Sequence, residues 1–146
     1  MRISQYKNFW FNVFLFTSLC FSNTVLADVV VIVNPANDHS LTKVSKIKKY
    51  FLRKKKKFSN GQAVIPVVPP VGSKEREIFN EKVLHRSASQ LKAYWSRIIF
   101  SGKGSPPKAL SDAAAVKAFV AKNTRAIGYI DSSLADDSVK IIYTIK

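Results

Sequence analysis

Gly72, Ser73 and Arg76 form the group of residues in this sequence that is best suited to bind an anion. They follow an apolar run that predicts a strand over 63–68, and they stand where the pattern predicts a helix over 74–85. The first N–H groups of a helix have no intrahelical partner and carry the positive end of the helix dipole. An oxyanion placed there would receive backbone hydrogen bonds, a hydroxyl donor from Ser73 and a charged planar donor from Arg76.

Two further properties of this segment bear on the interpretation. Gly72 would let the backbone approach a ligand closely, and Lys74 would add a positive charge. Ser73 also fits the N-cap position of the helix, however, and strand–Gly-Ser–helix junctions are common. Taken alone, these residues favour a simple cap over a binding site.

The other residues with chemical potential do not assemble into a catalytic or metal pattern. His39 and His85 are the only histidines, too few for a metal site or a triad without partners. Asp131, Asp136 and Asp137 lack the alternating spacing of a calcium loop. No nucleophile-elbow pattern is present either. The sequence therefore predicts a protein that is not an enzyme and that uses no cofactor or metal.

Residues 1–27 have the three parts of a secretory signal. Arg2 and Lys7 give a positive start, an apolar stretch covers 9–21, and the small residue Ala27 ends the segment. The alternative is an uncleaved anchor, but the apolar stretch is short for a span of about 20 residues. We therefore expect export and cleavage near Ala27, with no stable membrane span afterwards.

The mature chain, residues 28–146, contains no cysteine, because Cys20 is the only one in the sequence. This excludes disulfides, thiolate catalysis and cysteine-ligated metal from the mature protein. No linker or internal repeat divides this segment, and its length suits one domain with one apolar core. Stability must then come from that core.

The chain is strongly basic, with a formal net charge of +15. Without Arg2 and Lys7, 22 basic residues stand against 9 acidic ones. Such a charge favours anionic partners, namely phosphate-type ligands, nucleic acid, acidic polysaccharide or an anionic membrane surface. Export argues against nucleic acid as the natural partner, so we interpret the run Arg53–Lys57 as a solvated loop.

Hydrophobic periodicity supplies the elements that must position the candidate site. The pattern predicts strands over 28–33, 63–68, 126–130 and 139–145 and helices over 41–51, 74–85, 87–102 and from 111 onward. Strands that alternate with helices indicate an α/β sandwich with a mixed, mostly parallel sheet flanked by helices.

Helix ends and helix faces can also be predicted. Ser40, or else Thr42, would cap the first helix, Ser87 opens a capping box, Gly102 ends that helix, and Ser111 would cap the last one. One side of the helix after Ser87 is expected to pack inward through Leu91, Tyr94, Trp95, Ile98 and Ile99. The last helix is expected to pack through Ala115, Val116, Phe119 and Val120.

Four stretches resemble the phosphate-type periplasmic solute-binding proteins of ABC uptake systems. They are Val-Val-Ile-Val-Asn-Pro over 30–35, the helical segment 41–52, Gly-Ser-Lys-Glu-Arg-Glu-Ile-Phe over 72–79 and Ala-Ile-Gly-Tyr-Ile over 126–130. The family's helix ending in Ile-Phe-Leu-Gly-Lys is matched by Lys-Tyr-Phe-Leu-Arg over 49–53. The family's phosphate loop, Gly-Ser-Gly-Thr-Arg-Glu, is matched at Gly72-Ser73 and Arg76-Glu77, whereas Lys74-Glu75 replaces its Gly-Thr. An arginine and an aspartate that precede the family's Gly-Ser pair are replaced by Pro69 and Val71.

The resemblance implies an exported, periplasmic protein with a single lobe of the type II solute-binding fold over residues 28–146. It implies a phosphate or related oxyanion site at Gly72, Ser73, Lys74 and Arg76, and an ABC permease as a partner in uptake. The alternative is an interaction module that kept the fold without the ligand and docks on an acidic envelope protein.

Overall fold

The computed structural model describes residues 28–38 and 42–146. The predicted signal segment, residues 1–27, and the candidate cap Ser40 lie outside the described residues. Along the chain the elements are β1 (Val29–Val33), α1 (Val44–Phe51), β2 (Ile65–Val68), α2 (Lys74–Phe79), a π-helical turn (Asn80–Leu84), α3 (Ala88–Phe100), β3 (Lys108–Ala109), α4 (Ala113–Lys122), β4 (Ala126–Asp131), a 3-10 turn (Ser132–Leu134) and β5 (Lys140–Ile145).

The five strands form one mixed sheet in the order β3-β2-β4-β1-β5. All five residues of β1 are buried, as expected for a continuous β-branched run covered on both faces. β1 pairs antiparallel with β4 and β5, while β2 pairs parallel with β4 and β3. The α/β fold with a mixed sheet is confirmed. Parallel pairing does not dominate, however, because the two parallel ladders are shorter than the antiparallel ladders of β1.

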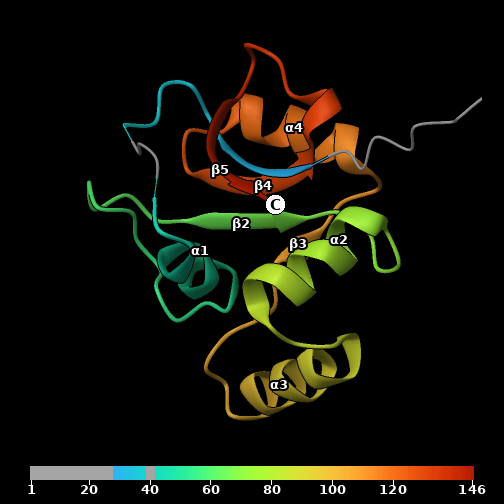
Figure 1. Ribbon diagram of the computed structural model, residues 1–146. Helices are drawn as coiled ribbons and strands as arrows, with labels where there is room; N and C mark the ends of the chain where they lie inside the picture. The colour runs from blue at the N-terminus through green and yellow to red at the C-terminus, as the bar shows by residue number, and fades with distance from the viewer. Residues whose placement is uncertain (1–27, 39–41) are drawn as a thin grey trace, which may run out of the picture.

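Helices cover both faces of this sheet, with α4 on one side and α1 and α2 on the other (Figure 1). On the α1 and α2 side, three aromatic rings form the centre of the core. Phe79 stacks on Tyr129 with ring centroids 3.9 Å apart, and Phe51 meets both rings edge-on at 4.7 and 5.5 Å. This packing joins the helix that follows Gly72-Ser73 to the central strand β4.

The opposite face is packed by α4. Val116 and Val120 are fully buried there against residues of β1 and β4, such as Ile32 and Ile130. Ala115 and Phe119, the other two residues expected to face inward, are half-buried.

The helix ends confirm some predictions and correct others. Ser87 and Gln90 form the expected capping box, and Gly102 ends α3 with a positive φ of 66°. The last helix is capped by Asp112 and not by Ser111, since an Asp112 carboxylate oxygen accepts the Ala115 N–H at 2.7 Å. The Asp112 carboxylate thus takes the capping role that was expected of the Ser111 hydroxyl.

The first helix also begins later than expected. Lys43 occupies the N-cap position of α1 and makes no side-chain capping bond, so Thr42 is not the cap. Thr42 instead donates its backbone N–H to the Ile142 carbonyl at 3.3 Å, which attaches this end of the helix to β5. Tertiary pairing replaces local capping at this position.

The inward side of α3 is narrower than its sequence suggested. Leu91 is buried and Tyr94, Trp95 and Ile98 are half-buried, but Ile99 is exposed. In Figure 1, α3 lies farther from the sheet than any other helix. Within residues 28–38 and 42–146, no helix has the length and apolar character needed to cross a bilayer.

Candidate functional site

A tight turn connects β2 to α2 and positions the candidate anion site. The Ser73 N–H donates to the Pro70 carbonyl at 3.2 Å, which closes a turn whose third residue is Gly72. Gly72 has a φ of +84°, a backbone conformation that residues with a Cβ rarely adopt. A glycine is therefore needed at this position by the turn itself.

The first turn of α2 begins directly at Ser73. The Ser73 carbonyl accepts the N–H groups of Arg76 and Glu77, each at 3.1 Å. These are the first bonds of the helix, so the N–H groups of Lys74 and Glu75 precede them and lack an intrahelical acceptor. The arrangement has the free donors that an oxyanion requires.

The Ser73 side chain distinguishes this turn from a simple cap. Ser73 has the backbone conformation of an N-cap residue, yet its hydroxyl makes no capping bond. Its Oγ atom is buried, and among the described residues it is the one buried side-chain oxygen or nitrogen without a hydrogen-bond partner. A buried hydroxyl without a partner is destabilising by roughly 1–3 kcal/mol. The capping explanation of Ser73 therefore fails for its side chain.

Arg76 is half-buried and turns back toward the loop. One of its terminal nitrogens donates to the Pro69 carbonyl at 2.9 Å, so part of the guanidinium holds the loop in place. Arg76 also lines a narrow cleft of about 30 Å³ between α2 and α3, together with Tyr129 and Trp95. The guanidinium thus lies on the inner side of the loop, close to the aromatic core.

The pKa of Tyr129 responds to charged side chains near the turn between β2 and α2. Burial raises the pKa of Tyr129 well above its usual range, Arg76 opposes this effect and Glu75 adds to it. Both charged side chains therefore act on the same buried ring. Sequence reasoning singled out Tyr129 only as part of a strand, because nothing in the sequence relates two positions that lie 53 residues apart.

The remaining charged residues of this turn differ in direction and sign. Lys74 is exposed, and no contact of its side chain with another described residue defines it as a ligand-binding group. Glu75 and Glu77 bring acidic groups into the first turn, where they complement the helix dipole. The structure thus places Gly72, Ser73 and Arg76 along one continuous turn and leaves Lys74 at its outer side.

Across the described part of the chain, no three His, Cys, Asp or Glu side chains gather closely enough to hold a metal ion. His85 ends the π-helical turn in a left-handed conformation, with a φ of 51°, and His39 lies outside the described residues.

Comparison with known structures identifies the fold. No family model matches the sequence, and a search of curated proteins finds no significant match. Among solved structures, a Clostridium perfringens protein assigned as a phosphate ABC transporter substrate-binding protein, solved with bound phosphate, aligns with a TM-score of 0.64 at 23% identity. An ABC-type phosphate transport receptor from Vibrio cholerae aligns at 0.63 and 18%, and PstS from Borrelia burgdorferi at 0.61 and 9%.

These alignments define the class of the fold. Each covers 79% of this chain but only 44–46% of the other chain, so this chain spans less than half the length of those proteins. The chain therefore has a short form of the phosphate-type solute-binding fold. The expected resemblance and the α/β class are both confirmed.

Proposed function

We propose that this protein is an exported, periplasmic solute-binding-like domain that binds phosphate or a related oxyanion at the first turn of α2. Ser73 would donate its hydroxyl hydrogen to an anion oxygen, and the N–H groups of Lys74 and Glu75 would add backbone donors. Gly72 keeps the turn open to the ligand, while Arg76 and Lys74 supply positive charge. The buried, unpartnered Oγ of Ser73 carries this proposal.

The names of the solved structures support a role in phosphate binding. One protein with the same fold is assigned as a phosphate ABC transporter substrate-binding protein and was solved with bound phosphate, and another is named a phosphate transport receptor. By the same reasoning, the partner in transport would be an ABC permease. Cleavage of residues 1–27 would release the domain into the periplasm.

The experiment is a thermal-unfolding titration of the chain that begins at Asp28, with phosphate, sulfate and chloride at matched ionic strength. A specific ligand at 100 times its dissociation constant stabilises a fold by about 2.7 kcal/mol. We expect a phosphate-selective shift in the wild type and its loss in Ser73→Ala. Ser96→Ala, an exposed position on α3, is the matched control and should keep the shift.

The stability of the ligand-free variant separates binding from folding. Ser73→Ala removes a buried hydroxyl without a partner, so the ligand-free variant should be as stable as the wild type or more stable by about 1 kcal/mol. Loss of the phosphate shift with unchanged stability would assign the site to Ser73. A phosphate shift that persists in Ser73→Ala would refute that assignment.

A second candidate function rests on a specific observation. Arg76 already donates to the Pro69 carbonyl, and Glu75 and Glu77 bring negative charge to the same turn. These contacts would suit a module that keeps the fold without binding a ligand at this turn. Such a module would dock on an acidic envelope protein through its basic surface. Small, equal shifts with all three anions would favour this alternative, because screening does not distinguish the anions.

A further inference from the structure

The C-terminal end of α3 presents two large apolar side chains to solvent. Phe100 is 92% exposed and Ile99 is 55% exposed. Exposed apolar side chains that lie next to each other and are bordered by polar residues mark surfaces that bind a partner or a membrane. Neither side chain contributes to the two apolar clusters that hold the fold together.

Contacts on the other side of α3 fix which face points outward. Leu91 is buried, and the Tyr94 hydroxyl donates to the Leu52 carbonyl at 2.8 Å. The Arg86 guanidinium lies 5.2 Å from the centre of the Tyr94 ring. This side attaches α3 to the body of the protein, whereas Phe100 on the other side is exposed. Figure 1 shows α3 at the edge of the fold, away from the sheet.

The charge around this helix has one sign. No acidic residue occurs between Glu81 and Asp112, whereas the segment carries Lys82, Arg86, Lys92, Arg97, Lys103 and Lys108. Lys92, Arg97 and Lys103 are exposed on or just after α3. The basic run after α1 adds to this charge, because Arg53 lines the same hollow as Lys108. A partner of this face must therefore be anionic.

The shape of the face selects among anionic partners. A second copy of this chain would bring two basic surfaces together, which like-charge repulsion opposes. A stable protein interface needs about 1,000 Å² of complementary surface, far more than two side chains at a helix end provide. A bilayer requires no complementary shape, and it accepts apolar side chains next to basic ones at its headgroup boundary.

We infer that the C-terminal end of α3 is a peripheral docking site for an anionic phospholipid surface. Phe100 and Ile99 enter the boundary between headgroups and acyl chains. Arg97 and Lys103 contact anionic headgroups, and Lys92 extends the basic border along the helix. This site is separate from the oxyanion site at Ser73, so either one can fail without affecting the other.

The test measures binding of the chain from Asp28 to vesicles of phosphatidylcholine with and without phosphatidylglycerol. Trp95 on α3 is the only tryptophan after residue 27 and packs against the core, so its emission checks that the helix stays folded in each variant. We expect co-sedimentation with phosphatidylglycerol vesicles only. The double variant Phe100→Ser with Ile99→Ser should partition at least about tenfold more weakly, because it removes the apolar contribution of both side chains.

Matched variants test the role of charge and of position. Arg97→Gln with Lys103→Gln should weaken binding about fivefold for each charge removed. Lys122→Gln with Arg125→Gln removes the same charge at exposed positions at the end of α4 and in the loop after it, and should change binding much less. Leu134→Ser is the control for the apolar pair, since Leu134 is 38% exposed away from α3.

Three results would overturn the inference. They are absence of binding to phosphatidylglycerol vesicles, unchanged binding of the Phe100 and Ile99 double variant, and equal losses in the two charge pairs. Circular dichroism of each variant checks that the fold is intact. An intact fold is expected, because all the substituted side chains are exposed.

Discussion

Three helix N-termini in this protein show how differently similar residues behave. Ser87 and Asp112 each accept a backbone N–H with the side chain, as helix caps ordinarily do. Ser73 stands at the same kind of position, but its Oγ is buried and bonds to nothing. Residue type alone therefore does not distinguish a cap from a candidate ligand donor. The surroundings of the side chain in the folded structure decide.

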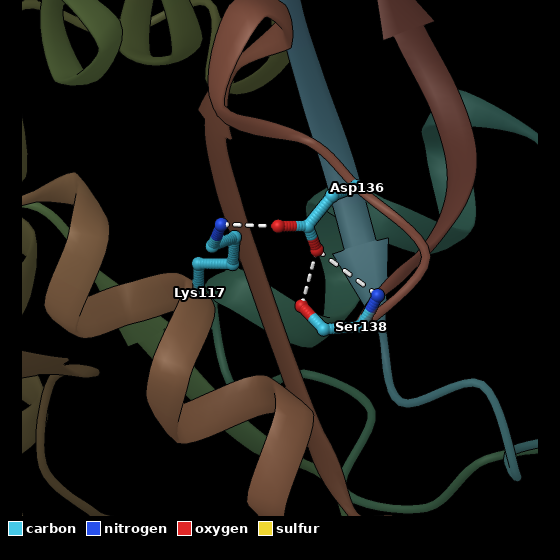
Figure 2. Close-up of polar contacts among 3 residues, drawn as sticks. All are labelled: Lys117, Asp136 and Ser138. Carbon is cyan, nitrogen blue, oxygen red and sulfur yellow. Dashed lines mark hydrogen bonds and ion pairs between the residues drawn. The ribbon is translucent and has the colours of Figure 1, made fainter.

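Asp136 offers a second residue-scale feature, at the loop before β5. One of its carboxylate oxygens lies 2.6 Å from the Lys117 ammonium nitrogen on α4, and the other accepts the Ser138 N–H at 3.0 Å and also the Ser138 hydroxyl (Figure 2). The hydrogen bond from Lys117, followed by those from Ser138, lowers the pKa of Asp136 from 3.8 to about 2. The ionised carboxylate thus ties this loop to α4.

This pKa shift predicts how stability depends on pH. Because the folded pKa lies below the unfolded one, the contribution of Asp136 is present above about pH 3.8 and is lost as the pH falls toward 2. We expect Asp136→Asn to lose less stability than the wild type across that interval, as measured by urea unfolding at each pH. Asp137→Asn, which removes the neighbouring charge, is the control, and equal pH dependence in both variants would contradict the prediction.

At the scale of elements, the close packing of α4 on β4 depends on Gly128. A Cβ added there would lie 2.7 Å from a Val116 methyl group and 3.3 Å from methyl groups of Val120 and Val67. Contacts this short force the helix away from the sheet. The glycine is needed for space here, whereas Gly72 is needed for its backbone conformation.

Gly128→Ala should therefore destabilise the fold by about 1–3 kcal/mol, the usual effect of overpacking a core. Val116→Ala alone should also destabilise, because it removes buried methyl groups. The double variant should be more stable than the sum of the two effects predicts, since the smaller residue 116 makes room for the new methyl group. Urea unfolding of both single variants and the double variant provides the measurement, and strict additivity would refute this account.

At the scale of the whole molecule, charge opposes compactness. The formal net charge is +15, and only one ion pair, Lys117–Asp136, is formed among the described residues. Salt therefore screens mostly repulsion, over a length of about 10 Å at 0.1 M. We expect the melting temperature to rise between low and physiological sodium chloride in calorimetry. A fall over this range would show that attractive pairs dominate, contrary to the contacts seen.

The sequence by itself determined the kind of elements and much of their order. The β-branched run before Asn34, the capping box at Ser87 and the stop at Gly102 act through local chemistry, and each appears where it was predicted. The Gly72-Ser73 junction was also recognised, since a glycine followed by a serine has few local interpretations. The signal segment and the role of the four site residues stay predictions.

Tertiary structure alone decided the directions and partners of these elements. Periodicity cannot tell that β1 inserts antiparallel between β4 and β5, because the alternation of side chains is the same in both directions. Nor can it tell that Arg76 bonds the Pro69 carbonyl, that Ile99 and Phe100 face solvent, or that the Ser73 hydroxyl is buried without a partner. These outcomes depend on which distant parts of the chain contact one another in the fold, and local sequence does not specify those contacts.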